Sequence, residues 1–170
     1  DTLLGPEMKS TGEVMGIDIG FGSAYAKAQL GAGQKISSTG TVFISVCDKD
    51  KKKALSAAKQ FTELGFNILA TSGTHAFLRA KGIESQKITK VSEGQPHVAD
   101  AIKNGAIQLV INTGSGDEIR QDGYRIRRVA LKFNIPYTTT IAGAIALSKA
   151  VTMLKKEALN IKSIQEYHQN

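Results

Sequence analysis

The sequence predicts an α/β fold, namely a doubly wound, five-stranded parallel sheet flanked by helices in Rossmann-like layers. Short runs of β-branched and apolar residues alternate along the chain with amphipathic helical segments, and glycines separate them. Hydrophobic residues make up 41% of the 170 residues, which is enough for the core of one domain. Strands that alternate with helices pair in parallel through right-handed crossovers, so we expect a parallel sheet.

The first half of the pattern begins with a buried strand at residues 41–46, a run that is β-branched and apolar. A helix at 51–64 follows, because apolar residues recur on one of its faces and Gly65 ends it. The next expected elements are a strand at 66–70, a short helix at 74–81 and a weaker strand at 83–88.

The second half continues the alternation. Pro96 is placed to start a helix that runs to residue 103, since proline is favoured in the first turn of a helix. Residues 107–111 form the clearest central strand, and residues 114–122 form a glycine-rich polar loop. The remaining expected elements are an amphipathic helix at 124–133, a short strand at 136–139 and a long helix at 142–154.

A separate segment precedes the first strand. Residues 21–30 are rich in alanine and favour a helix, but residues 1–36 together carry too little apolar surface to fold alone. We therefore expect this segment to be the tail of a preceding region. The sheet domain would then span residues 37–160, and residues 161–170 would form a C-terminal tail.

The charge balance favours anionic ligands. The formal net charge is +7, which suits nucleic acid, a membrane surface, small anions or simply a solvated charged face. Aromatic residues do not interleave the basic runs, so small phosphorylated ligands are favoured over polynucleotides. The single cysteine, Cys47, permits no intrachain disulfide and fits a reducing compartment. No apolar run is long enough to span a bilayer.

Residues suited to a phosphorylated ligand follow four of the expected strands. Thr71, Gly73 and Thr74 open a helix, where hydroxyls and unpaired N–H groups favour an anion, although these residues also suit an ordinary helix cap. Lys51 and Lys90 each follow a strand and could contact a phosphate, although either could be a solvated lysine. Ligands of such sheets bind outside the carboxyl ends of the strands, so these residues predict an anion site.

The strand at 107–111 ends in Asn112 and Thr113, which complete the candidate set. An asparagine amide can contact a base or ribose edge, and the alternative is a turn that ends the strand. His97 could act as a general base, but a histidine at a helix N-terminus is the simpler interpretation.

The chain resembles the C-terminal part of carbamoyl-phosphate synthase large chains. Residues 7–16 (EMKSTGEVMG) are similar to the closing stretch of the second ATP-grasp half of that family. From residue 41 onward the chain looks like the methylglyoxal-synthase-like domain that ends those large chains. The matching motifs are 43–46 (FISV), 70–74 (ATSGT), 90–97 (KVSEGQPH), 111–113 (INT) and 126–128 (IRR).

The resemblance implies a regulatory domain that binds UMP or IMP as an allosteric effector. It places phosphate contacts on Lys51, Thr71, Gly73, Thr74 and Lys90, and base or ribose contacts on Asn112 and Thr113. In members that ornithine activates, a threonine at the start of the last helix contacts it, and this matches Thr139. The resemblance assigns residues 1–36 to the ATP-grasp tail and gives this segment no catalytic residue, metal ligand or cofactor.

The resemblance also implies a cytoplasmic parent enzyme that makes carbamoyl phosphate for pyrimidine and arginine biosynthesis. That enzyme uses bicarbonate, ammonia from a glutaminase small chain, and ATP with Mg or Mn and K. The expected partners of this segment are the rest of the large chain and a second copy of the domain, with no nucleic acid and no membrane.

Two other functions fit the same superfamily. A methylglyoxal synthase-type lyase needs a carboxylate base in a Gly-Gly-Asp turn and a histidine, but this chain has residues 92–95 (SEGQ) and Gln121 at those places. An oligomerisation module is the second alternative. The chain also departs from the regulatory family at Asp117 and Glu118, whose negative charge would weaken anion binding if they rim the pocket.

Overall fold

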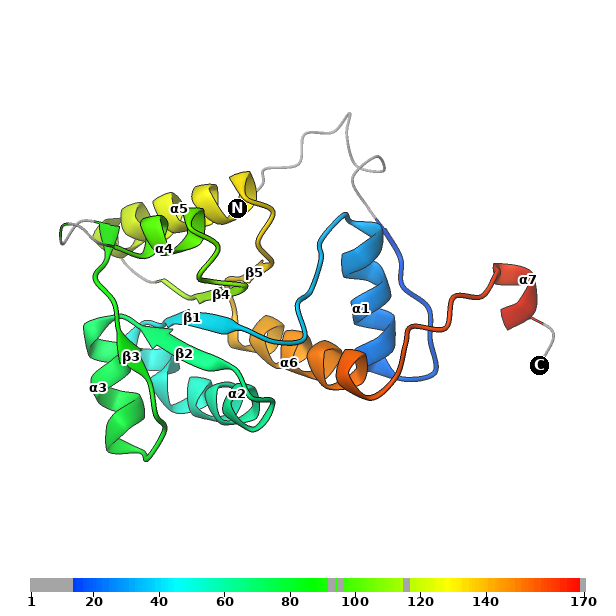
Figure 1. The fold of residues 1–170 in the computed structure, drawn as a ribbon, viewed down its shortest axis with the longest axis horizontal. Coiled ribbons are helices and arrows are strands. Elements are labelled where there is room, and N and C mark those ends of the chain that lie inside the picture. Colours follow the sequence, from blue (N-terminus) through cyan, green and yellow to red (C-terminus); the bar gives the residue numbers. More distant parts are fainter. Residues whose placement is uncertain (1–13, 92–93, 95–96, 115–116, 169–170) are drawn as a thin grey trace.

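The sheet is five-stranded and parallel throughout its described pairs. The computed structural model describes residues 14–91, 94, 97–114 and 117–168 (Figure 1). The strand order is β3-β2-β1-β4-β5. In this doubly wound order successive strands are added on one side of β1 up to β3, and then on its other side from β4 onward. The strands are β1 (Thr41–Ser45), β2 (Asn67–Ala70), β3 (Gln86–Lys87), β4 (Leu109–Asn112) and β5 (Tyr137–Thr138).

Helices cover both faces of the sheet, which confirms the predicted α/β layering. On one face α2, α3 and α6 pack against Val42 and Ile44 of β1. On the other face α4 and α5 pack against Phe43, because neighbouring strand residues point to opposite faces. These helices are α2 (Lys51–Glu63), α3 (Ser72–Ala80), α4 (Val98–Lys103), α5 (Asp117–Lys132) and α6 (Ile141–Lys156), and a short 3₁₀ turn spans Asp48–Asp50.

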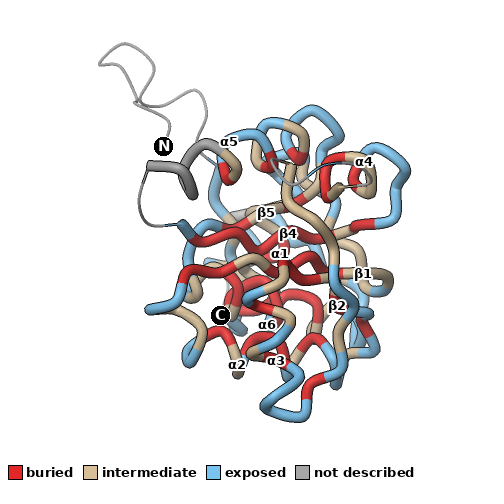
Figure 2. Tube along the Cα trace, turned by 90° about the vertical axis from the view of Figure 1, so that its left-hand side faces the viewer, coloured by how far each residue is buried: buried red, intermediate tan, exposed pale blue. Residues whose placement is uncertain are grey.

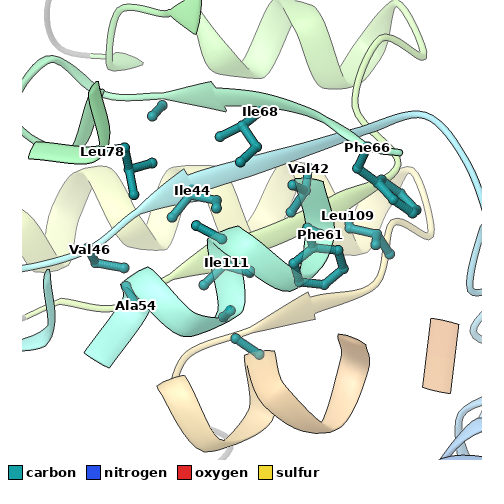
Figure 3. Packing of buried hydrophobic residues seen from close by; sticks show 14 of the residues in the cluster. Val42, Ile44, Val46, Ala54, Phe61, Phe66, Ile68, Leu78, Leu109 and Ile111 are labelled. Atoms are coloured by element: carbon teal, nitrogen blue, oxygen red, sulfur yellow. The ribbon is translucent and has the colours of Figure 1, made fainter. Parts of the chain in front are cut away.

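The core is mostly aliphatic, with a few buried phenylalanines. Figure 2 shows the central strands β1 and β4 buried, and every residue of β4 is buried. Figure 3 shows the side chains of β1, β2 and β4 that meet those of α2 and α3. The aromatic pair in this layer, Phe61 and Phe66, meets edge to face with ring centroids 5.6 Å apart. The buried centre of the sheet therefore lies next to the loops that leave β1 and β4.

A further helix, α1 (Phe21–Gly31), packs on α6 rather than on the sheet (Figure 1). The backbones approach closely, since a Cβ added at Gly22 would lie 2.7 Å from the carbonyl oxygen of Lys149. The ammonium of Lys149 lies 5.5 Å from the centroid of the Phe21 ring. The short helix α7 (Ile164–Tyr167) lies near the end of the described chain. The helix predicted at residues 21–30 thus exists, and it is attached to the sheet domain through α6.

Three sequence predictions need correction. Helix α5 begins at Asp117, so much of the loop predicted at 114–122 is helical, and acidic residues are favourable at a helix N-terminus. Strand β3 has only 2 residues, because the predicted strand at 83–88 lies at the sheet edge and pairs on one side only. Helix α4 begins at Val98, with the backbone N–H of His97 donating to Asp100 at 3.2 Å. Pro96 lies outside the described residues.

Candidate functional site

A cavity of about 270 Å³ lies at the carboxyl edge of the sheet, above the point where the strand order reverses. This is the position where open α/β sheets bind their ligands. The cavity is lined by residues that follow β1, β2, β3 and β4. Its walls contain all of the residues predicted to contact an effector phosphate, base or ribose, namely Lys51, Thr71, Gly73, Thr74, Lys90, Asn112 and Thr113.

One end of the cavity is cationic. The ammonium of Lys51 lies beside the start of α3, where a Cβ added at Gly73 would be 3.4 Å from it. The same ammonium forms an ion pair of 2.7 Å with Asp48, whose side chain is 93% exposed. The hydrogen bond from Lys51 holds the pKa of Asp48 below its usual value. Lys51 is therefore already partnered by an exposed surface carboxylate, which was not predicted from the sequence.

Two buried threonine hydroxyls stand beside this cationic end. The Thr74 hydroxyl oxygen accepts from the Val46 N–H at 3.2 Å and faces the Thr71 hydroxyl at 3.4 Å. The Thr71 hydroxyl also lies 3.3 Å from that of Ser45. Because its oxygen is already an acceptor, the Thr74 hydroxyl has its own proton left to donate. Both residues are at most 4% exposed, so their positions are set by packing.

The start of α3 is not closed by an ordinary cap. Thr71 occupies the N-cap position in an extended conformation, yet its side chain makes no capping hydrogen bond. The first N–H groups of a helix have no partner within the helix, and Gly73 and Thr74 of this first turn line the cavity. This geometry favours the anion-site interpretation of Thr71, Gly73 and Thr74 over the simple cap.

The other end of the cavity is built from β4 and α5. Asn112 is 3% exposed, and its side-chain carbonyl oxygen accepts from Arg127 Nη1 at 3.2 Å. Gly123 lies against this pair, since a Cβ there would be 2.7 Å from the Asn112 oxygen and 2.9 Å from Arg127 Nη1. Ile126, which is 1% exposed, and Asp122 also line this end. A buried amide, an apolar side chain and a carboxylate are groups that can contact a base.

Thr113 is hydrogen-bonded to the turn that follows β1. Its hydroxyl oxygen accepts from the Cys47 N–H at 3.3 Å, and the Cys47 thiol donates to Asp50 at 3.1 Å. Hydrogen bonds from Cys47 and then Thr113 hold the pKa of Asp50 below its usual value. Cys47 is buried and lines the cavity.

Thr139 lies apart from this cavity. It lines a neighbouring hollow of about 640 Å³ together with Thr140, at the start of α6. Thr113 and Lys49 contribute to both hollows, so the two adjoin. The residue predicted to contact ornithine therefore lies next to the predicted nucleotide residues without joining them.

Sequence analysis missed the contributions of Asp48, Arg127 and the α5 residues. The strand-end rule could have found Asp48, which lies close after β1, whereas α5 residues reach the cavity from a helix whose start was placed too late. Residues 92, 93 and 95 lie outside the described part of the chain, and the side chains of Asp117, Glu118 and Gln121 are not described either. Within the part that is described, three or more His, Cys, Asp or Glu side chains do not gather as a metal site would require.

The comparison with protein families now identifies the domain, because the model of the MGS-like domain matches residues 53–139. The chain belongs to the MGS-like domain family. The matched range includes β2, β3, β4, β5 and each of the predicted site residues except Lys51. The family is consistent with the parallel sheet and its flanking helices. None of the helices described for this MGS-like domain is long and apolar enough to cross a membrane.

Curated relatives extend the similarity over the whole chain. A carbamoyl phosphate synthase large chain of Nostoc sp. is 52% identical over 170 residues, which are 100% of this chain and 15% of the relative. The large chain of Archaeoglobus fulgidus is 54% identical to this chain. The match includes 99% of this chain and 16% of that relative. The C-terminal section of the Aquifex aeolicus large chain is 51% identical to this chain. The match includes 99% of this chain and 32% of that section. The resemblance to these large chains is thus confirmed, and the chain spans about a sixth to a third of the length of these relatives.

Proposed function

We propose that this MGS-like domain is the nucleotide-sensing C-terminal section of a carbamoyl phosphate synthase large chain. Its cavity binds a nucleoside monophosphate such as UMP or IMP, with the phosphate at the Lys51 end. In this proposal the parent enzyme makes carbamoyl phosphate with ATP and a glutaminase small chain, and this section regulates it without catalysing a step. The high identity to large chains over the full chain supports the assignment to that enzyme.

The observation that carries the effector proposal is the convergence of residues from four strand ends on one cavity. Lys51 and Lys90 supply cations, and the first turn of α3 supplies N–H groups. A dianionic phosphate suits this set, because charge-assisted hydrogen bonds and the helix dipole both favour it. Charge-assisted bonds contribute about 1.5–3 kcal/mol each, so the phosphate would supply much of the affinity.

Calorimetric titration of the chain with UMP, IMP and uridine tests this proposal. We expect both nucleotides to bind and the uncharged nucleoside to bind poorly. Replacing Lys51 or Lys90 by Ala should weaken UMP binding by about tenfold or more. Lys59→Ala is the matched control, because Lys59 is exposed and lies further along the same helix as Lys51. Equal binding of uridine and UMP would contradict a phosphate site.

A further inference from the structure

The amide of Asn112 has a fixed orientation, and the reason is its partner. A guanidinium group can only donate hydrogen bonds. The Asn112 side-chain atom that lies 3.2 Å from Arg127 Nη1 must therefore be the carbonyl oxygen. Because that oxygen already accepts from Arg127, the NH₂ is the group of Asn112 that can donate to a ligand. The amide is thus set as a donor toward the cavity that Asn112 lines.

We propose that Arg127 is a specificity-determining positioning residue, which makes the cavity select nucleotides whose base carries a carbonyl oxygen rather than an amino group at C4 of a pyrimidine or C6 of a purine. The inference rests on the proposed nucleotide site and adds which bases it accepts. Arg127 acts through Asn112, since it is Asn112 and not Arg127 that lines the cavity.

Packing prevents the amide from turning over. Asn112 is 3% exposed at the end of a fully buried strand, so a flipped amide would turn its NH₂ toward the guanidinium. The close approach of α5 depends on Gly123, where a Cβ would come within 2.9 Å of both partners. Glycine inside a helix costs about 1 kcal/mol relative to alanine. Its presence at this point of α5 is explained by the space that the pair of Asn112 and Arg127 requires.

The location of Asn112 suits contact with a base. The phosphate end lies over β2, whereas Asn112 ends β4, and β1 lies between them. Two strand spacings amount to about 10 Å, a distance that a ribose and its base can span. The apolar side chain of Ile126 lines the same end, where it can pack against a base ring. A ligand held by its phosphate would therefore bring its base to Asn112.

The hydrogen-bonding pattern of this end matches one class of base edge. Asn112 supplies a donor, and Asp122 supplies a carboxylate, which can only accept when ionised. Uracil and hypoxanthine carry a carbonyl oxygen next to a ring N–H, which is the complementary order. Cytosine and adenine carry an amino group next to a ring nitrogen acceptor, so a donor would face a donor. Buried polar groups left without partners are costly, which produces discrimination.

Paired titrations of UMP against CMP and of IMP against AMP test the inference. We expect the wild-type chain to prefer UMP over CMP and IMP over AMP by about tenfold or more. Arg127→Met should bring each ratio toward one while phosphate-dependent binding persists, and Arg127→Lys, which keeps a donor, should restore part of the preference. Arg125→Met is the control and should leave both ratios unchanged, because Arg125 is exposed on the same helix.

A second variant tests the inference without changing Arg127, and so does not require the Arg127→Met chain to fold. Asn112→Asp replaces the NH₂ donor by an acceptor and should shift the preference toward CMP and AMP. Equal wild-type binding of UMP and CMP, or an unchanged ratio in a folded Arg127→Met chain, overturns the proposed selection while the phosphate site stands. Failure of every nucleotide and of inorganic phosphate to bind would overturn the nucleotide site itself and this inference with it.

Discussion

At the scale of single residues, the ion pair between Lys51 and Asp48 is the feature that the sequence analysis did not foresee. The Asp48 side chain is almost fully exposed, and its carboxylate lies 2.7 Å from the Lys51 ammonium at the edge of the cavity. An incoming phosphate needs the same ammonium. In the proposed phosphate site Asp48 would therefore compete with the anionic ligand and lower the affinity of the cavity.

We predict that Asp48→Asn strengthens UMP binding by about twofold to fivefold, the range expected from an exposed ion pair. The gain should shrink as salt is added, because salt screens exposed charges. Calorimetric titration at two salt concentrations measures both effects. Glu63→Gln, which changes an exposed acid at the far end of α2, is the control. An affinity that falls on Asp48→Asn would show that this carboxylate supports the ligand instead.

At the scale of the elements, the contact between α1 and α6 depends on a glycine. Gly22 is buried, and a Cβ there would lie 2.7 Å from both the Lys149 carbonyl oxygen and the Met153 side chain. The Met153 side chain can move, but the Lys149 carbonyl belongs to the backbone of α6. The two helices must therefore separate to admit even a methyl group.

We predict that Gly22→Ala lowers the thermal unfolding midpoint, although alanine favours a helix over glycine by about 1 kcal/mol. Gly31→Ala is the matched control in the same helix, because its Cβ would lie 3.6 Å from Val14, an ordinary contact distance. The control should leave the midpoint unchanged or raise it. Differential scanning calorimetry measures the unfolding midpoint of both variants. A midpoint raised by Gly22→Ala would contradict the close contact between α1 and α6.

The elements also show what a sequence can and cannot predict. The five strands and their helices were predictable because buried parallel strands are short apolar runs, and residues 107–111 illustrate this. The start of α5 was not, because Gly123 and the glycines near it are typical of a loop. Only the folded structure shows that Gly123 lies inside a helix at a point where a Cβ would meet Asn112.

The residues of the candidate site likewise include some that the sequence could predict and some that it could not. Residues at strand ends, such as Thr71 and Lys90, were predictable because parallel strands bring their carboxyl ends to one edge. Arg127 was not, because its contribution depends on a side-chain partner that no spacing rule supplies. Thr139 was predicted from family resemblance alone, and its hollow adjoins the cavity without merging with it.

At the scale of the whole molecule, the segment before α1 and the end of the described chain are joined at one cluster. The Lys27 ammonium of α1 forms an ion pair of 2.8 Å with Asp18 and donates to the Tyr167 hydroxyl at 2.8 Å. The Tyr167 hydroxyl in turn donates to the Ile17 carbonyl at 2.8 Å. Side chains separated by 140 residues thus hold α1, its preceding segment and α7 together.

The charges of this cluster make its contribution depend on pH in a defined direction. The hydrogen bond from Lys27 is the main cause that lowers the pKa of Asp18 below its ordinary 3.8. The hydrogen bond to Asp18 is likewise the main cause that raises the pKa of Lys27 above its ordinary 10.5. A carboxyl with a lowered pKa stabilises the fold above its unfolded pKa, and that stability is lost as the pH falls through the folded value. The ammonium contribution is lost only as the pH rises through its raised value.

We therefore predict that Asp18→Asn lowers the free energy of unfolding at neutral pH, and that the gap to the wild type narrows as the pH falls below 3.8. The reason is that protonation removes from wild-type Asp18 the charge that the substitution has already removed. Urea unfolding of both chains, between about pH 7 and about pH 3, measures the gap. The exposed Glu63→Gln should show no comparable gap at neutral pH. A gap of constant size across this range would mean that Asp18 stabilises the cluster through its hydrogen bonds to the backbone and not through its charge.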